Sequence, residues 1–360
     1  MLEPGTVLQG RYRIEDQIGQ GGMGTVYLAR QIRLADRAVA IKELKPTGSR
    51  PDERAAFVKQ FEREARILAT LQHPGLVDVK DFFEENHWLY LVMDYIDGKT
   101  LAQIVRQPAD PAHLLDMIDW GLQVTEVLHY LHNHSPVIVV RDLKPGNVML
   151  QKDGRIRLID FGIAREFRDS QSDSSTTAFM KGAGSPGFAP PEQYGSNTDP
   201  RTDIYALGAT LYACIAAKVP PISVLLMAGE EVLRPLNEVN PVVCPKLSRV
   251  IHQMMSLKRD DRPQTVAVVE VLLREARAAQ LAFETGEEVD SGPLAAVPTQ
   301  LLDRVCPQCS GFLAGSDTCP KCSSMMPTAQ ETEASRPRQA SYWQNVLPPS
   351  AALPTPPTAS

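Results

Sequence analysis

The spacing of apolar residues predicts a β-sheet at the start of the chain. Residues 11–18, 25–32 and 37–43 are rich in Val, Ile and Tyr, and glycines or a charged turn separate the three runs. Between residues 52 and 70, apolar side chains recur at spacings of four, seven and three, the stripe of an amphipathic helix. Two more strand-like runs follow at 76–83 and 88–94. This part of the chain is therefore expected to form a small sheet with one helix.

The pattern becomes helical after residue 98. Helical periodicity covers residues 111–134, and further helix-like segments lie at 203–217, 246–256 and 264–281. The longest stretch without charge or proline, Ile204–Ala217, has 14 residues, which is too short to span a bilayer. It is expected to be a buried core helix, and no membrane span is predicted.

The pattern changes again near residue 282. An acidic linker is expected at 282–304, followed by a cysteine-bearing segment at 305–323. The last 25 residues hold six of the chain's 29 prolines, so residues 324–360 are expected to be a disordered or polyproline-like tail. No internal repeat is visible.

Composition narrows the class of protein. With 360 residues, 43% hydrophobic and 22% charged, the chain has the make-up of one large globular domain plus something smaller. A net charge of −6 provides no general attraction to nucleic acid or to an anionic membrane. The N-terminus lacks the basic and apolar regions of a secretory signal, so a cytoplasmic location is expected.

A glycine-rich segment, residues 19–24, matches the pattern G-x-G-x-x-G. Glycines permit a tight turn and let backbone N–H groups approach phosphates. Residues 25–29 continue as a strand rather than a helix, which argues against a dinucleotide-binding fingerprint and favours a hairpin covering a nucleotide. A glycine-rich turn without a ligand is the alternative.

Two charged residues lie at positions expected to be apolar. Lys42 ends an apolar strand, and Glu64 lies on the apolar stripe of the first helix. An ion pair between them would relieve the cost of both and hold the ammonium ready for phosphate oxygens. The alternative is that Glu64 turns to water and Lys42 lies at a strand edge.

A dense polar cluster follows the apolar run 137–140. Residues 141–147 hold Asp142, Lys144 and Asn147, and Asp160 ends another apolar strand 13 residues later. Two carboxylates and an amide on neighbouring loops suit Mg²⁺, which prefers one or two carboxylates together with substrate phosphates.

In their order along the chain, these motifs resemble the eukaryotic-like (Hanks-type) bacterial serine/threonine protein kinases. The set consists of Gly19–Gly24, Val39–Lys42, Glu64, Arg141–Asn147, Asp160–Gly162, Pro190–Glu192, Asp203 with Gly208, and Arg262. The resemblance implies an α+β, bilobal kinase fold. A tail at 1–10 would precede a small β-rich N-lobe at 11–95 and a larger helical C-lobe at 96–281.

The resemblance also implies how ATP would be bound. The loop glycines would cover its phosphates, and these are Gly19, Gly21, Gly22 and Gly24. Lys42 would bind the α- and β-phosphates, and Glu64 would hold Lys42.

Further matching positions would surround adenine. Val26, Ala40 and Met149 would sandwich the base, Met93 would gate the deep pocket, and the backbone of Asp94–Ile96 would hydrogen-bond the base.

The same resemblance assigns the chemistry. Asp142 would accept the proton of the substrate hydroxyl, and Lys144 would neutralise the γ-phosphoryl group. Asn147 and Asp160 would bind Mg²⁺, or Mn²⁺ in its place. The expected activity is phosphoryl transfer from ATP to Ser or Thr of proteins, including this chain through self-association.

Three positions depart from the kinase pattern. Val140 replaces the usual His, Pro190 replaces the usual Ala, and Ser185 stands in a segment where the family has Gly-Thr. Val140 is expected to affect stability or regulation. None of the three removes a group expected to touch ATP, Mg²⁺ or the transferred proton.

The polar loop before residue 184 is expected to be a mobile loop with a phosphorylation switch. Its candidate hydroxyl residues are Ser174, Ser175, Thr176 and Thr177. A phosphate on one of them could pair with Arg141 and Arg165 and order the loop.

Four cysteines form two C-x-x-C pairs, separated by nine residues: Cys306, Cys309, Cys319 and Cys322. This spacing suits a structural tetrahedral Zn²⁺ and resembles zinc-ribbon knuckles. Disulfides are the alternative, disfavoured in a reducing cytoplasm. Lys321 is the one basic residue inside the segment, so a protein partner or an intramolecular contact is favoured over nucleic acid. Cys214 and Cys244 are expected in the core.

Two rival functions remain open. A pseudokinase scaffold would bind nucleotide without turnover, but Lys42, Asp142, Asn147 and Asp160 are all present. A small-molecule phosphotransferase would share the Asp-Asn and Asp pair, but the glycine loop and Arg262 argue against it.

Overall fold

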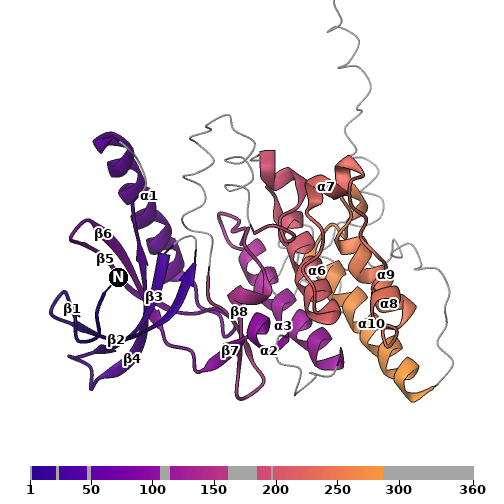
Figure 1. The fold of residues 1–360 in the computed structure, drawn as a ribbon, viewed down its shortest axis with the longest axis horizontal. Helices are drawn as coiled ribbons and strands as arrows, with labels where there is room; N and C mark the ends of the chain where they lie inside the picture. Colours follow the sequence, from indigo (N-terminus) through magenta and orange to yellow (C-terminus); the bar gives the residue numbers. More distant parts are fainter. Residues whose placement is uncertain are drawn as a thin grey trace, which may run out of the picture. The chain divides into compact units, whose positions relative to one another are not determined.

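The computed structural model describes residues 2–21, 24–46, 50–105, 114–160, 185–195 and 198–286. The chain separates into two units, Met1–Asp303 and Arg304–Ser360, and all of the described residues belong to the first. Within that unit a β-rich part precedes a helical part (Figure 1).

The β-rich part is built on a six-stranded sheet in the order β1-β2-β3-β4-β6-β5, with antiparallel neighbours. The strands are β1 (Val7–Leu8), β2 (Tyr12–Gly21), β3 (Gly24–Gln31), β4 (Arg37–Leu44), β5 (Val79–Glu85) and β6 (Trp88–Asp94). Helix α1 (Pro51–Thr70) packs against β5, where Phe61 meets Phe82 edge to face, and its Phe57, Phe61 and Leu68 are buried, which confirms the predicted stripe.

The two faces of this sheet are buried in separate cores. One face carries an aromatic cluster that includes Tyr12, Tyr27 and Tyr90, and Leu8 of β1 is 3% exposed within it. The segment expected to be a tail before residue 11 therefore contributes a strand and a core side chain. The other face joins a larger core that continues into the helical part.

The helical part packs around α6 (Pro200–Ala216), in which every residue from 202 to 215 is buried. Its other elements are α2 (Leu101–Val105), α3 (Leu114–His132), η1 (Pro145–Asn147), η2 (Pro191–Gly195), α7 (Ser223–Ala228), α8 (Leu236–Val239), α9 (Pro245–Met254), η3 (Arg259–Asp261) and α10 (Val266–Thr285). Helix α6 confirms the predicted core helix. No helix in the described ranges combines the length and the apolar character that a bilayer crossing requires.

A small sheet lies where the two parts meet. Strands β7 (Gly98–Thr100), β8 (Val148–Gln151) and β9 (Ile156–Leu158) form it in that order. The N–H of Val77 donates to Leu158 O at 3.1 Å, and the N–H of Leu158 donates to Gly75 O at 2.8 Å. The strand expected to begin at residue 76 therefore begins at Val79, because the preceding backbone pairs with β9 instead.

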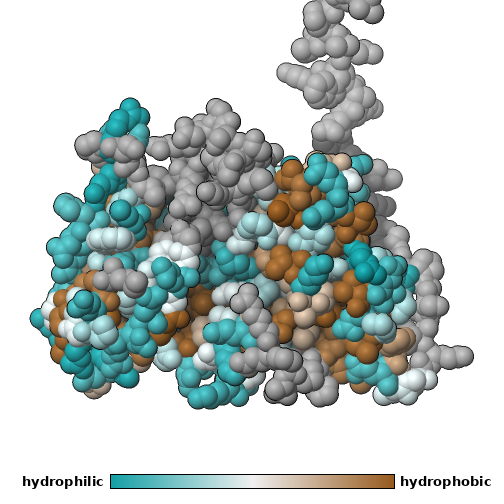
Figure 2. Space-filling view, viewed as in Figure 1, coloured by the Kyte–Doolittle hydropathy of each residue, from teal (hydrophilic) through white to brown (hydrophobic). Residues whose placement is uncertain are grey.

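The surface differs between the two parts. On the face shown in Figure 2, hydrophilic residues cover α1, and hydrophobic residues gather over the helices around α7. Val219, Val224 and Met227 are the large exposed apolar residues in or beside α7.

Candidate active site

The glycine segment forms the tip of a β-hairpin. Gly21 of β2 pairs with Gly24 of β3, which confirms the predicted strand–turn–strand arrangement; Gly22 lies outside the described residues. Gly24 has φ +150°, and a Cβ there would lie 1.9 Å from Glu43 O. Because no side chain fits that space, glycine is required at this position.

Lys42 forms its ion pair with Asp160 in the part of the chain that the structure describes. The Nζ–Oδ1 distance is 2.6 Å, and the lysine side chain is 10% exposed. The predicted partner, Glu64, instead accepts a hydrogen bond from Gln60 Nε2 at 2.6 Å. Glu64 is half-buried, one residue before Ala65 on the buried stripe of α1. In the described residues Lys42 thus pairs with Asp160, which joins the two lobes, and its pairing with Glu64 stays a prediction.

The loop after residue 139 is held by α6. Asp203, which is fully buried, accepts hydrogen bonds from the backbone N–H groups of Val140 and Arg141, each at 2.9 Å. His132 Nε2 lies 2.8 Å from the same carboxylate. Val140 is 2% exposed, so the position where the kinase pattern has His is filled by an apolar core residue.

Asp142 lies at the centre of a polar cluster. It is 3% exposed; Lys144 Nζ donates to its Oδ2 at 3.0 Å, and Ser185 Oγ donates to its Oδ1 at 2.9 Å. Lys144 Nζ also lies 2.7 Å from Ser185 Oγ. A carboxylate, an ammonium and an alcohol are therefore in mutual contact.

Asn147 and Asp160 are brought together by a backbone contact. The amide of Asn147 donates to Asp142 O at 2.8 Å, which leaves its oxygen as the atom suited to a cation. The backbone carbonyl of Asn147 accepts a hydrogen bond at 3.0 Å from the N–H of Ile159, which directly precedes Asp160. No group of three or more His, Cys, Asp or Glu side chains able to hold a metal occurs among the described residues. One carboxylate and one amide fit Mg²⁺ if phosphate oxygens complete the coordination.

The positions expected to surround adenine share one apolar cluster. It includes Val26, Ala40, Met93, Ile96 and Met149. Ala40 pairs with Met93 across β4 and β6.

The carboxylate of Asp94, one of the expected hinge residues, forms ion pairs with two basic side chains. Its carboxylate pairs with Arg37 at 3.0 Å and with Lys80 at 3.2 Å, and its N–H donates to Asp78 O at 3.0 Å. The expected contact of the backbone of Asp94–Ile96 with a base stays a prediction.

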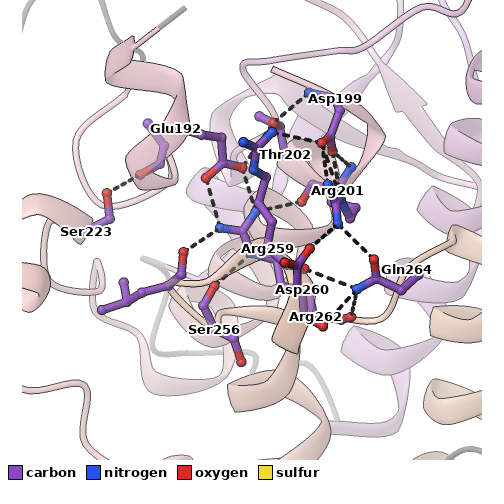
Figure 3. A network of polar contacts seen from close by, with 12 residues as sticks. Glu192, Asp199, Arg201, Thr202, Ser223, Ser256, Arg259, Asp260, Arg262 and Gln264 are labelled. Carbon is purple, nitrogen blue, oxygen red and sulfur yellow. Dashed lines mark hydrogen bonds and ion pairs between the residues drawn. The ribbon is translucent and has the colours of Figure 1, made fainter. Parts of the chain in front are cut away.

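The segment after Ser185 is anchored by a buried ion pair (Figure 3). Arg262 Nη1 and Nη2 lie 2.6 and 3.0 Å from the two carboxylate oxygens of Glu192, with side-chain exposures of 0% and 7%. Both residues belong to the set of positions that resemble the kinase pattern.

Several predicted site residues lie outside the described residues. They are Gly22, Arg165, Ser174, Ser175, Thr176, Thr177, Cys306, Cys309, Cys319 and Cys322. Sequence reasoning in turn missed Gln193, which contacts the carbonyl of Arg141, and His132, which contacts Asp203. Neither residue is distinguished by its neighbours, because Gln193 follows Glu192 and His132 precedes Asn133 and His134.

Comparison with known proteins places this geometry in a family. A family model described as protein kinase domain matches residues 12–271. A probable serine/threonine-protein kinase of Clostridium acetobutylicum is 35% identical over 266 residues, which are 72% of this chain and 39% of that protein. The serine/threonine-protein kinase PknB of Mycolicibacterium smegmatis is 33% identical over 296 residues, covering 79% and 44%. The chain thus spans less than half the length of these relatives.

Solved structures agree with the sequence comparison. A structure named PpkA-294 in its apo form matches with a TM-score of 0.65 and 33% identity, covering 76% of this chain and 99% of that one. The kinase domain of Mycobacterium tuberculosis PknI matches with a TM-score of 0.58 and 27% identity, covering 77% and 100%. Because the family model spans residues 12–271, well over half of the sequence, this chain belongs to the protein kinase domain family.

Proposed function

We propose that this protein is an ATP-dependent serine/threonine protein kinase. The observation that carries the proposal is the contact of Asp142 with an alcohol: Ser185 Oγ donates to its carboxylate at 2.9 Å beside Lys144. An acceptor hydroxyl held in the same way would lie within the range required for general-base catalysis.

Asp142 is the proposed base in this reaction. It would orient the acceptor hydroxyl and take its proton as the oxygen bonds to the γ-phosphorus, while the bond from that phosphorus to the β,γ-bridging oxygen breaks and ADP leaves. Lys144 would offset the negative charge of the transferred group, since its ammonium already lies between the carboxylate and a hydroxyl. The buried backbone contacts to Asp203 keep this loop fixed while the substrates change.

Lys42, Asn147 and Asp160 are the proposed phosphate and cation ligands. The Lys42 ammonium would bind the α- and β-phosphates, and Asn147 and Asp160 would hold Mg²⁺ or Mn²⁺. When bound, the cation would neutralise phosphate charge. The hairpin glycines would cover the phosphates, and Val26, Ala40, Met93 and Met149 would enclose adenine.

The proposed acceptors are Ser and Thr residues of proteins. They include this chain's own loop, reached through self-association of two copies. An ATP-dependent reaction favours a cytoplasmic location for the kinase unit. The residues that bind ATP and metal are all retained, which argues against a pseudokinase. The Glu192–Arg262 anchor argues against a small-molecule phosphotransferase.

Asp160→Asn tests the proposed activity because it removes a cation-binding charge and little volume. We expect phosphate transfer from labelled ATP to casein, and to the chain itself, to fall at least ~100-fold, or about 3 kcal/mol of transition-state stabilisation. Circular dichroism should show an intact fold. Asp153→Asn, at a side chain that is 56% exposed, is the matched control and should transfer at the wild-type rate. Wild-type transfer by Asp160→Asn would refute the assignment.

We also propose that phosphate on the hydroxyl cluster at 174–177 activates the kinase by pairing with Arg141 and Arg165. Replacing Ser174, Ser175, Thr176 and Thr177 together with Ala should lower activity on casein, and phosphatase treatment of the wild type should do the same. Unchanged turnover in both experiments would contradict the switch.

For the C-terminal unit we propose a structural zinc site formed by Cys306, Cys309, Cys319 and Cys322. The proposal is supported by the spacing of the two C-x-x-C pairs. The segment has a single basic residue, so its proposed partner is a protein surface rather than nucleic acid.

A further inference from the structure

Gln193 of η2 is a buried polar side chain in contact with the catalytic loop. It is 6% exposed, and its Nε2 donates to the carbonyl oxygen of Arg141 at 2.7 Å. Its other polar atom, Oε1, is buried and has no hydrogen-bond partner in the described part of the chain. Only the donor end of this amide is therefore used.

The carbonyl that Gln193 holds belongs to an unusual stretch of backbone. Arg141 has φ +63°, a region that residues other than glycine rarely occupy. The N–H of Asp142 donates to Val140 O at 2.8 Å, so the chain makes a three-residue turn centred on Arg141. Such a conformation costs free energy and persists only when its surroundings impose it.

The surroundings impose it from two sides. On one side, Asp203 of α6 binds the N–H groups of Val140 and Arg141. On the other, Gln193 binds the carbonyl of Arg141, which belongs to the same planar peptide unit as the N–H of Asp142. Because that unit leads directly into Asp142, its orientation sets the direction of the Asp142 side chain.

Gln193 is itself held in place by its neighbours. The preceding residue, Glu192, forms the buried ion pair with Arg262, and the following residue, Tyr194, is 8% exposed in a small apolar cluster. The amide is thus presented to the loop from a rigid support. This arrangement links the anchored segment after Ser185 to the residue that would act as base.

We propose that Gln193 is a positioning residue for phosphoryl transfer: its amide fixes the Arg141–Asp142 peptide and thereby aims the Asp142 carboxylate at the acceptor hydroxyl. The inference rests on the proposed kinase function. It predicts that loss of the donor lowers kcat, whereas the nucleotide-binding residues keep their places and the KM for ATP stays unchanged.

The alternative is that Gln193 only fills space. Replacing Gln193 with an apolar side chain of similar size has two opposing effects on stability. It removes a buried oxygen, Oε1, that has no hydrogen-bond partner among the described residues, and it removes the hydrogen bond from Nε2 to the carbonyl of Arg141. The thermal stability of Gln193→Met should therefore stay near that of the wild type, even though the donor is lost.

The test compares steady-state kinetics of the full chain with casein and ATP as substrates. For Gln193→Met we expect kcat to fall at least ~10-fold, since small errors in the position of a reacting group are costly, with the KM for ATP within ~2-fold of the wild type. Gln193→Glu keeps the shape of the side chain but loses the amide donor, so it should also lower kcat without changing the KM for ATP. Either variant alone is sufficient for the test if the other does not fold.

Gln280→Met is the matched control. Gln280 is also buried, and its amide donates to Val242 O and accepts from Cys244 N, both at 2.8 Å, outside the candidate active site. This variant should lower the melting temperature but leave kcat at the wild-type value when measured well below that temperature. Gln193→Met should instead lower kcat and keep a melting temperature near that of the wild type.

Three results would overturn the inference. Wild-type kcat in a folded Gln193 variant would do so, and so would a fall in kcat that matches the loss of folded protein. A wild-type chain that phosphorylates neither casein nor itself would overturn the proposed function, and the role of Gln193 with it.

Discussion

Arg262 is a buried cation whose donors are all directed at oxygen atoms. Besides Glu192, its guanidinium donates to the carbonyls of Ser256 at 2.7 Å, Leu257 at 3.2 Å and Arg201 at 3.0 Å. It also lies 5.0 Å from the centre of the Tyr205 ring. Removing one member of such a pair strands a buried charge, which costs far more than the intact pair contributes.

Glu192→Gln should therefore destabilise the chain strongly. We expect the free energy of unfolding in urea to fall by about 3 kcal/mol or more, because Arg262 keeps its charge without a counter-ion. Glu270→Gln is the control: Glu270 forms a helical pair with Arg274, whose side chain is 58% exposed, and its loss should cost about 0.5 kcal/mol or less. Equal losses in the two variants would contradict this account of the anchor.

At the scale of elements, helix α6 connects the catalytic loop to the anchor. Its buried Asp203 holds the loop backbone, and Thr202 Oγ1 donates to Glu192 at 3.2 Å. The helix begins after Asp199, whose side chain accepts from the N–H of Arg201 at 2.8 Å and so caps the first turn. Arg201 and Arg259 also pair with Asp199, at 2.9 and 3.0 Å (Figure 3).

This cap should make stability depend on acid pH. Burial disfavours the charged form of Asp199, but the hydrogen bonds and charge of Arg201 and a hydrogen bond from Arg259 outweigh burial and lower the pKa of this carboxyl from its usual 3.8. The carboxylate therefore contributes its full stability above about pH 4 and loses it as the pH falls through the lowered pKa.

Asp199→Asn keeps a capping oxygen and removes the charge. The difference in unfolding free energy between the wild type and this variant should be constant from pH 7 to about pH 5 and should shrink below about pH 4. Urea titrations at each pH measure it, with Asp153→Asn as the exposed control. A difference that grows on acidification would show that the sign is wrong.

At the scale of the whole molecule, the two lobes of the first unit share one apolar core. This core contains Leu68 of α1, Met93 of β6 and Leu158 of β9, together with α6 and α10. The Lys42–Asp160 pair adds a polar link between residues 118 positions apart. The first unit, Met1–Asp303, thus has its own core and should fold without the second.

A chain ending at Asp303 should melt cooperatively, bind ATP and transfer phosphate at a rate near that of the full chain. A thermal melt with and without ATP, followed by the casein assay, measures these properties. A shortened chain that cannot fold or bind ATP would show that the kinase unit depends on the C-terminal unit.

The C-terminal unit should carry one zinc ion per full chain, because a segment this short gains its stability from metal. Elemental analysis of protein purified without chelator measures the metal. Replacing Cys306 and Cys309 with Ser should release the zinc and leave the melting temperature of the kinase unit unchanged. The control variant Cys214→Ser, in the kinase core, should keep its zinc. Absence of zinc in the wild type would refute the site.

Local chemistry was sufficient to predict much of this molecule. The spacing of apolar residues predicted the buried stripe of α1 and the core helix α6, because the faces of a helix follow from its own 3.6-residue period. The glycine hairpin could also be predicted from neighbouring residues, because a strand-forming run follows the glycines where a dinucleotide-binding fold would have a helix. The order of the motifs predicts one site with Asp142, Asn147 and Asp160; the structure joins Asn147 to Asp142, and the shared site stays a prediction.

Tertiary structure decided which groups meet. The sequence suggested only Glu64 as a partner for Lys42, whereas the placement of the lobes brings Asp160 to its ammonium, a contact that spacing cannot encode. The backbone before β5 pairs with β9, which lies about eighty residues later, so the strand begins further on than its own pattern predicts. The contact of Gln193 with Arg141 arises in the same way: periodicity describes one element at a time, whereas a buried polar contact depends on how two elements pack.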